Sequence, residues 1–243
     1  MIHLENRDII VTGSASGIGR ATAFILVELG ATVHAVDING DALKNLKKEG
    51  GESIHTHVVD VADAKQVADF FELLMSDRFP DSLVNNAGIY FGKSILEYEA
   101  GDIEKILSVN IASAILFSKH FAQHAITRAV DSCIVNISSV SGQEASSDAV
   151  YGASKAAIIG LTKSCALNFA PHVRVNAVAP GVVDTPMMQN IPEERLRSYH
   201  EHELIQQPTK SEDVASTIAF LLSGAARHYT GAVFDLNNGC YMR

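Results

Sequence analysis

The sequence predicts an α/β protein in which helices cover both faces of a doubly wound parallel sheet. Short segments rich in Val and Ile alternate with longer segments rich in Ala and Leu from end to end. The short segments are apolar throughout, as strands buried on both faces are. Strand–helix alternation of this kind is typical of a parallel sheet between two helical layers. The 243 residues suit one domain and contain no internal repeat.

The elements follow in a regular order. Strands are expected at residues 8–12, 31–37, 55–60, 83–85, 133–137, 173–178 and 232–236. Helices are expected from the glycine-rich 13–19 segment to about residue 29, then at 41–49, 64–77 and 150–169, with others between the later strands. The 186–209 segment interrupts this rhythm, and a long excursion in a compact fold is usually a binding loop. We therefore expect a substrate loop there.

Composition excludes several classes of protein. A chain that is 47% hydrophobic and 19% charged is not disordered. The net charge of -9 disfavours nucleic acid and acidic protein partners. The N-terminus has no signal-peptide pattern, and the apolar run at 21–29 is too short to span a membrane. Three widely spaced cysteines fit a reducing compartment, so we expect a cytoplasmic protein: Cys133, Cys165 and Cys240.

A glycine-rich loop separates the first strand from the first helix. Gly13 permits a tight turn, while Gly17 and Gly19 let the backbone approach a pyrophosphate at the helix N-terminus. A plain tight turn would also use glycine, but the position between strand and helix favours a dinucleotide.

Asp37 lies at the expected end of the second strand, 24 positions after Gly13. A carboxylate there can accept both ribose hydroxyls and repels a 2′-phosphate, whereas the alternative is an Asp that caps the following turn or helix. Neither Ser16 nor the 38–40 segment offers a Lys or Arg for a 2′-phosphate. The sequence therefore favours NAD as cofactor over NADP.

Tyr151 and Lys155 are four residues apart and share one face of the expected helix. Tyrosine has a pKa of about 10 and is a poor base at neutral pH. A cation about 4 Å away contributes about 4 kcal/mol at an effective dielectric of about 20, enough to lower the phenol pKa by about three units. The pair predicts a tyrosine that exchanges a proton near neutral pH.

Further motifs follow the glycine-rich loop along the chain. Together with the loop, and in order, they are 12–19, Asp60 with Val61, Asn85 with Asn86, Ala87 and Gly88, Asn110, Ser138 with Ser139, Tyr151 with Lys155, and 180–185. With these motifs the chain resembles, over 7–239, the short-chain dehydrogenase/reductase family, in its single-domain subfamily of roughly 250 residues that includes 3-oxoacyl carrier-protein reductases.

The resemblance implies a role for each catalytic residue. Tyr151 is the general acid/base, Lys155 holds the nicotinamide ribose and lowers the phenol pKa, and Asn110 helps to hold a relay water. Neighbouring strand residues point to opposite faces, so only one of Ser138 and Ser139 can contact the substrate. The family pattern favours Ser139, with Ser138 as the alternative.

The resemblance also implies the cofactor site. Asp60 and Val61 contact adenine, the Asn86 segment packs against the cofactor, and the 180–185 segment holds the carboxamide. Turn chemistry alone could explain the last two segments. The full expected set is Gly13, Ser16, Gly17, Ile18, Gly19, Asp37, Asp60, Val61, Asn86, Ala87, Gly88, Tyr151, Lys155, Pro180, Gly181, Val183 and Thr185.

The implied fold is a Rossmann-type nucleotide-binding domain over 1–243 with parallel strand order 3-2-1-4-5-6-7. The implied activity is hydride transfer between NAD(H) and a secondary alcohol or ketone. The alternatives are an NADPH-dependent 3-oxoacyl carrier-protein reductase of fatty-acid synthesis, or an NAD-sensing regulator without catalysis. The family has Asp-Gly-Gly near its C-terminus, where this chain has Asn237, Asn238 and Gly239. We therefore expect the terminal turn, and not the catalytic group, to differ from the family pattern.

The expected partners are a small alcohol or ketone and further copies of the chain. The 150–169 helix is apolar nearly all round, and the family commonly pairs it across a tetramer or dimer interface. The ten histidines show no convincing ligand spacing, so we expect no metal. Gln143, Glu144 and Asp148 would line the substrate pocket with Ile89 and Tyr90 and suggest a polar substrate, or are solvated loop residues.

Overall fold

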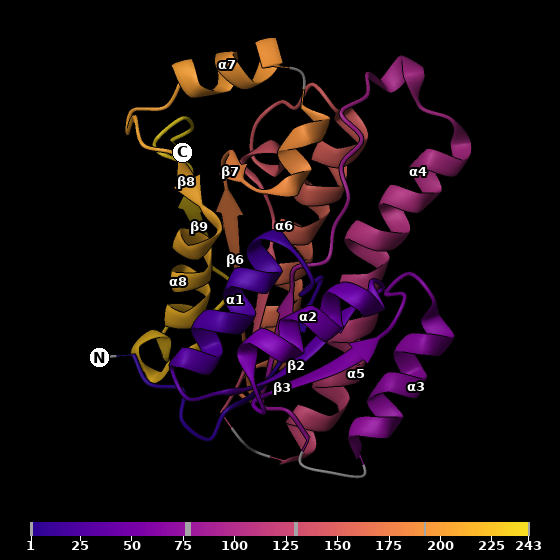
Figure 1. Cartoon of the computed structure of the whole chain (residues 1–243), viewed down its shortest axis with the longest axis vertical. Coiled ribbons are helices and arrows are strands. Elements are labelled where there is room, and N and C mark those ends of the chain that lie inside the picture. Colours follow the sequence, from indigo (N-terminus) through magenta and orange to yellow (C-terminus); the bar gives the residue numbers. More distant parts are fainter. Residues whose placement is uncertain (1, 76–78, 129–130, 192, 243) are drawn as a thin grey trace.

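Seven strands pair in parallel in one sheet in a computed structural model that describes residues 2–75, 79–128, 131–191 and 193–242 (Figure 1). The sheet order is β3-β2-β1-β4-β5-β6-β9. Its strands are β1 Asp8–Thr12, β2 Thr32–Asp37, β3 Ile54–Val58, β4 Ser82–Asn85, β5 Ser132–Ile137, β6 Val173–Pro180 and β9 Val233–Leu236. The predicted doubly wound sheet and its order are confirmed, with β9 as the seventh strand.

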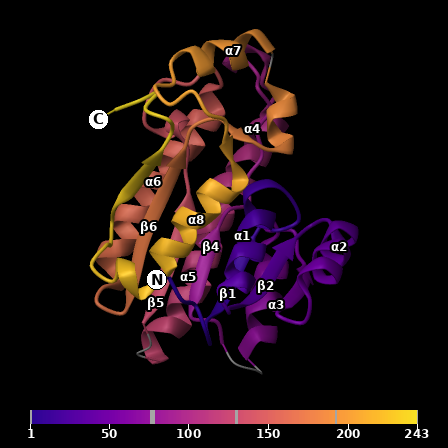
Figure 2. The same ribbon diagram turned by 60° about the vertical axis from the view of Figure 1, so that its left-hand side comes forward.

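Helices cover both faces of the sheet, each over its own hydrophobic core (Figures 1 and 2). Ile9 and Val11 of β1 face the first core, and Ile10 between them faces the second. This alternation explains why β1 is apolar at every position. The first core is covered by α1 Gly17–Glu28, α2 Gly40–Gly50 and α8 Ser211–Leu222; the second by α3 Ala64–Met75, α5 Ser113–Arg128 and α6 Ala149–Phe169.

Two features of the fold were not predicted. A π-helical turn, Ser108–Ala112, joins α4 Ala100–Leu107 to α5 and carries Asn110. A second sheet pairs β7 Val183–Asp184 with β8 Thr209–Lys210. Two-residue strands leave no periodicity in a sequence, and a π turn differs from an α turn by one residue.

The expected substrate loop contains regular structure. It begins with a 3₁₀ helix, Pro186–Asn190, and continues with α7 Glu193–Glu201, which lies at the top of both ribbon views. Position 192, the two chain ends at 1 and 243, and the expected end of the third helix at 77 lie outside the described residues. Shorter 3₁₀ turns occur at Ile95–Glu97, Val140–Gly142 and Gly224–Ala226.

Candidate active site

The glycine-rich loop has the geometry of a phosphate cradle. Gly13 and Gly17 have positive φ of 65° and 50°, which disfavours larger residues. A Cβ at Gly19 would lie 2.1 Å from the carbonyl oxygen of Gly13, so only glycine fits there. Ser16 is the N-cap residue of α1, yet no side chain of the described residues caps this helix. The first-turn amides of α1 therefore suit an anion such as a pyrophosphate, and the cradle fits the expected dinucleotide.

The loop is held by the segment that follows β4. The Nδ2 of Asn86 donates to the carbonyl oxygens of Thr12 at 2.8 Å and Gly13 at 3.1 Å. The backbone N–H groups of Asn86 and Ala87 both donate to the Thr12 hydroxyl. A Cβ at Gly17 would lie 3.3 Å from Cγ2 of Thr185. The expected cofactor segments after β1, β4 and β6 are thus adjacent.

The end of β6 brings the rest of its expected segment alongside β9. Gly181 donates its backbone N–H to the carbonyl oxygen of Leu236 at 2.9 Å. A Cβ at Gly181 would lie 3.1 Å from Cα of Asn237, so the close approach favours glycine. Pro180 ends β6, and Val183 is buried in β7. Asn237, which departs from the family pattern, therefore packs against the turn at Gly181.

The Asp37 carboxylate organises the backbone around the loop. Its Oδ2 accepts the N–H of Ala15 at 3.0 Å, and its Oδ1 accepts the N–H of Asn39 at 2.9 Å. Asp60 has a similar arrangement, since its Oδ1 accepts the N–H of Ala62 at 2.9 Å. Both acids have the turn-forming contacts that were the alternative interpretation of Asp37. A carboxylate oxygen accepts more than one hydrogen bond, so both retain capacity for a ligand.

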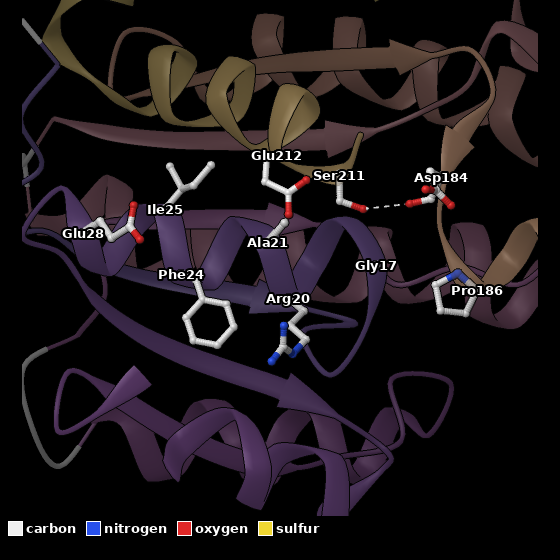
Figure 3. A pocket seen from close by; sticks show the side chains of 10 residues that line it. All are labelled: Gly17, Arg20, Ala21, Phe24, Ile25, Glu28, Asp184, Pro186, Ser211 and Glu212. Atoms are coloured by element: carbon white, nitrogen blue, oxygen red, sulfur yellow. Dashed lines mark hydrogen bonds between the residues drawn. The ribbon is translucent and has the colours of Figure 1, made fainter. Parts of the chain in front are cut away.

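A groove of about 550 Å³ lies on the outer side of the phosphate loop, between α1 and the start of α8 (Figure 3). Gly17 and Pro186 line its end nearest the loop, and Arg20 and Glu212 line its walls. Arg20 is ion-paired with Glu49 at 2.6 Å. None of Ser139, Tyr151 and Lys155 lines this groove, so it is separate from the expected catalytic centre.

Ser139, Tyr151 and Lys155 come together at the carboxyl end of β5. The Ser139 side chain is hydrogen-bonded to that of Tyr151. The Lys155 ammonium lies 5.7 Å from the centre of the Tyr151 ring and donates to the carbonyl oxygen of Ile137 at 2.9 Å. The Ser138 hydroxyl instead donates to the Lys155 carbonyl oxygen at 2.8 Å. Of the two serines, Ser139 is the one that faces the tyrosine.

The pKa of Tyr151 moves the opposite way from the expectation based on the sequence, and the pKa of Lys155 is shifted as well. Burial raises the pKa of Tyr151 to about 12, and the hydrogen bond from Ser139 opposes this rise. Burial also lowers the pKa of Lys155 to about 8. A phenol that titrates near neutrality is therefore not a property of the protein without its cofactor, because burial dominates the pKa of Tyr151.

Asn110 is buried, and its side chain bonds to one peptide unit on each side of Ile89. Its Oδ1 accepts the N–H of Ile89 at 2.8 Å, and its Nδ2 donates to the Ile89 carbonyl oxygen at 3.0 Å. The same Nδ2 donates to the Ser154 hydroxyl at 3.1 Å. A Cβ at Gly88 would lie 3.5 Å from Oδ1 of Asn110 and 3.4 Å from Nζ of Lys155. Because Gly88 has no side chain, the space between it and the polar ends of Asn110 and Lys155 stays open.

Asp148 has a structural role that the sequence analysis missed. It is fully buried and is the N-cap residue of α6, where it accepts the N–H of Tyr151 at 2.9 Å. It also accepts the N–H of Gly92 at 3.1 Å and the hydroxyl of Tyr98 at 2.7 Å. These three contacts explain why a carboxylate occupies this position, so Asp148 gives no indication that the substrate is polar. Burial and this carboxylate together raise the pKa of Tyr98.

Tyr90 lies beside Tyr151, where the sequence analysis placed the substrate pocket. The two rings pack edge to face with centroids 4.9 Å apart. Arg195 of α7 points one guanidinium nitrogen at the Tyr90 hydroxyl. The sequence analysis named neither Arg195 nor Tyr199, although their spacing of four places them on one face of a helix.

The described residues lack the features of a metal site and of a membrane-spanning helix. No group of three or more His, Cys, Asp or Glu side chains among them could hold a metal ion. No helix in the same part of the chain is long and apolar enough to cross a bilayer.

Comparison with known proteins agrees with this geometry. The family model described as enoyl-(acyl carrier protein) reductase matches residues 13–241. A 3-oxoacyl-[acyl-carrier-protein] reductase of Thermotoga maritima is 34% identical, over 98% of this chain and 99% of the relative.

Solved structures agree as well. A Brucella melitensis short-chain dehydrogenase/reductase, titled glucose/ribitol dehydrogenase, superimposes with a TM-score of 0.91 at 31% identity, covering 100% of this chain and 99% of its own. A 3-ketoacyl-(acyl-carrier-protein) reductase of the same organism, complexed with NADH, superimposes with a TM-score of 0.90 at 27% identity, covering 98% and 100%. Matches over nearly the whole chain, together with the seven-stranded fold, show that the protein belongs to the short-chain dehydrogenase/reductase family.

Proposed function

We propose that this oxidoreductase transfers a hydride between NAD(H) and a secondary alcohol or ketone, with Tyr151 as general acid/base. The observation that carries the proposal is the convergence of Ser139, Tyr151 and Lys155 beside a phosphate cradle. The Ser139 hydroxyl contacts the phenol, and the ammonium lies 5.7 Å from the ring. A non-catalytic NAD sensor would not need this trio.

Each residue has a distinct task in the proposed reaction. Bound nicotinamide supplies or takes up the hydride. In the oxidative direction Tyr151 accepts the hydroxyl proton, while Ser139 donates a hydrogen bond to the substrate oxygen. Lys155 uses one of its three donors on Ile137, so two remain for the cofactor ribose. Asn110 holds the Ile89 peptide at the edge of the pocket and, with it, the proposed relay water.

We propose NAD as the cofactor because Asp37 carries a charge at the point where a 2′-phosphate would bind. The experiment is calorimetric titration of the purified protein with NADH and with NADPH, side by side. Tighter binding of NADH is the expected result. Tighter binding of NADPH would contradict the proposed role of Asp37.

The activity itself is tested by a screen of secondary alcohols with NAD and of ketones with NADH. Turnover that depends on Tyr151 supports the proposal. A protein that binds NADH but turns over none of these compounds, and whose properties are unchanged in Tyr151→Phe, would be a sensor instead.

A second candidate is a 3-oxoacyl carrier-protein reductase, which the match to the Thermotoga maritima protein favours. The net charge of -9 argues against an acidic carrier protein as partner. The screen distinguishes the candidates if it includes a 3-oxoacyl thioester, with NADPH as well as NADH.

We also propose that the protein is a homo-oligomer that packs along α6. Leu167 of this helix is 82% exposed, and Ala153, Ala157 and Gly160 are exposed on it as well. A dimer or tetramer by light scattering is expected, and Leu167→Glu should dissociate it. A cytoplasmic location remains a prediction, which cell fractionation tests.

A further inference from the structure

Arg195 lies on the face of α7 that turns toward the active site. Its Nη1 lies 3.4 Å from both the Tyr90 hydroxyl and the Gly92 carbonyl oxygen. One turn later on the same face, the Tyr199 hydroxyl contacts that of Ser147 at 3.1 Å. Helix α7 is therefore fixed over the site with the Arg195 guanidinium pointing inward, and α7 lies at the top of both ribbon views (Figures 1 and 2).

Among the residues that the structure describes, Arg195 has no ion-pair partner within 4.0 Å. Both of its hydrogen bonds go to neutral oxygens, and no carboxylate of the described residues lies within 4.0 Å of it. Four other arginines of the described residues do have such partners, namely Arg7, Arg20, Arg174 and Arg197, whereas Arg128 and Arg227 resemble Arg195 in having none. A half-buried guanidinium with long contacts to neutral groups retains most of its five donors. Those donors match the geometry of a carboxylate.

The guanidinium is one side chain away from the catalytic tyrosine. It contacts the hydroxyl of Tyr90, and the Tyr90 ring packs 4.9 Å from the Tyr151 ring, centre to centre. Tyr90 is only 8% exposed, so the nitrogen that reaches it points into the protein. The nearby Asp148 carboxylate accepts hydrogen bonds from Tyr98, Gly92 and Tyr151, which compensate its charge.

We propose that Arg195 binds a carboxylate group of the substrate, so that the enzyme acts on small hydroxy acids and their oxo acids. This inference rests on the proposed function. In the oxidative direction the carbinol C–H and O–H bonds break and the C=O double bond forms. The hydride goes to NAD and the proton to Tyr151, while the carboxylate bound to Arg195 is unchanged.

An inward guanidinium fits a small acid better than a protein partner. The exposed side of α7 carries Glu193, Glu194 and Glu201 against a single cation, Arg197, so it would repel an acidic surface. A neutral alcohol would leave the positive charge of Arg195 without a partner in a partly desolvated site. A carboxylate supplies that partner and orients the hydroxyl carbon relative to Tyr151.

The first test measures binding without turnover. Butyrate and its neutral analogue butyramide are titrated calorimetrically into the protein, with and without saturating NADH. Butyrate is expected to bind at least tenfold more tightly than butyramide. Arg195→Met should abolish this difference, Arg195→Lys should retain part of it, and Arg197→Met should leave it unchanged. Arg197 is the matched control because it lies on the exposed side of the same helix.

Equal affinities for butyrate and butyramide, or an unchanged preference in Arg195→Met, would overturn the inference. Melting temperatures of all variants show whether a loss of binding reflects unfolding.

The second test measures turnover of 2-hydroxypropanoate, 3-hydroxybutanoate and 4-hydroxypentanoate against their methyl esters. Arg195→Met should raise KM for the acids about tenfold to a hundredfold and leave KM for the esters within about twofold. Turnover of neutral alcohols without any effect of Arg195 would overturn the inference but leave the proposed function intact. Binding of butyrate that depends on Arg195, without turnover of any acid or ester, would overturn the proposed function and with it the substrate class.

Discussion

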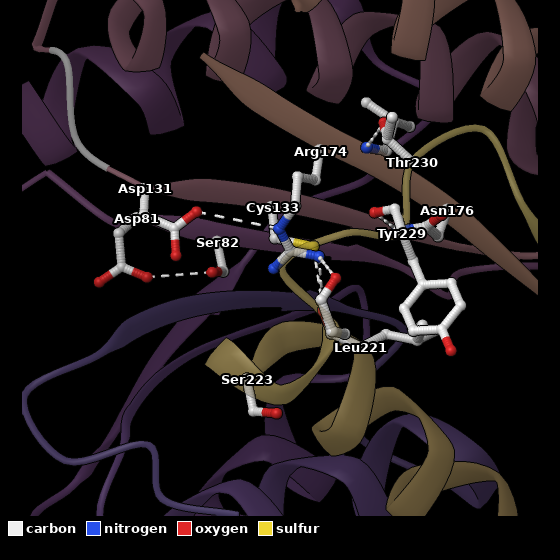
Figure 4. A network of polar contacts seen from close by, with 12 residues as sticks. Asp81, Ser82, Asp131, Cys133, Arg174, Asn176, Leu221, Ser223, Tyr229 and Thr230 are labelled. Atoms are coloured by element: carbon white, nitrogen blue, oxygen red, sulfur yellow. Dashed lines mark hydrogen bonds and ion pairs between the residues drawn. The ribbon is translucent and has the colours of Figure 1, made fainter. Parts of the chain in front are cut away.

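The two ends of the strands of the central sheet, called here the amino edge and the carboxyl edge, differ in how their buried charges are paired. At the amino edge, Arg7 lies 2.8 Å from Asp81. Arg174 donates to the carbonyl oxygen of Leu221 at 3.1 Å (Figure 4) and to that of Ala226 at the same distance. At the carboxyl edge, Lys155 is 4% exposed and donates to a single neutral carbonyl group.

The difference separates structural from functional polar groups. At the amino edge each of these cations has an anionic partner within the protein: Arg7 is paired with Asp81, and Arg174 lies 3.8 Å from Asp131, although Nε and Nη2 of Arg174 make no hydrogen bond among the described residues. At the carboxyl edge, Lys155 and Arg195 keep N–H groups that have no acceptor in the described structure. Such groups are unfavourable unless a ligand supplies the acceptors. We therefore expect substitutions at the amino edge to reduce stability and substitutions at the carboxyl edge to reduce activity.

The largest expected effect is that of Tyr151→Phe. Loss of the phenolic proton carrier should lower kcat by about 10²-fold to 10⁴-fold, because general acid–base catalysis contributes that much. The affinity for NADH by calorimetry and the melting temperature should stay the same. Tyr229→Phe is the control for loss of a phenol elsewhere, because Tyr229 is 44% exposed and packs against Phe220 and Phe234. Comparable kcat values for Tyr151→Phe and the unmodified protein would refute the assignment.

Arg174→Met tests the amino edge. The substitution removes the two hydrogen bonds to helix-end carbonyl groups and leaves Asp131 without this cation. The free energy of unfolding, measured with urea, should fall by about 2–4 kcal/mol, while kcat/KM of the folded protein is unchanged. An active-site defect in this variant would mean that the two edges are coupled.

Lys155→Met should make the protein more stable at pH 7 while it abolishes activity. Burial lowers the pKa of Lys155 to about 8, so the protonated form is unfavourable in the fold. Between that value and the unfolded pKa of about 10.4, the unfolded chain binds more protons and stability rises with pH. The variant should be about 1–2 kcal/mol more stable at pH 7, and its advantage should disappear near pH 10.

Urea unfolding followed by circular dichroism at both pH values measures this difference. A constant difference between the two proteins across this pH range would show that Lys155 is not the group responsible.

The sheet was predictable because its signals are local. Ile9, Ile10 and Val11 are apolar in a row because each lies between two cores, and this pattern is visible in one short segment. The glycine loop was predictable for the same reason, since Gly19 has no space for a Cβ.

What could not be predicted depends on contacts between distant segments. Asp148 looked like a substrate contact, but it caps α6 and binds Tyr98, 50 positions away. The choice between Ser138 and Ser139 needed the course of the chain after β5, and the pKa of Tyr151 needed its burial. Arg195 depends on such contacts too, because no sequence pattern indicates that its guanidinium reaches Tyr90 and Gly92 and has no described carboxylate within 4.0 Å.

The smallest expected effect concerns Asp37, which combines both kinds of behaviour. Its two oxygens hold the N–H groups of Ala15 and Asn39, like a structural group, yet it also faces the proposed ribose site. Asp37→Asn removes the charge and replaces one acceptor with a donor, so it should cost about 1 kcal/mol of stability. It should also shift the ratio of NADH to NADPH affinity about tenfold toward NADPH, because the repulsion of a 2′-phosphate is lost. Asp41→Asn, an exposed change on the following helix, is the control and should leave the ratio unchanged. A shift of equal size in both variants would mean that net charge alone sets the preference, and that the position of Asp37 does not.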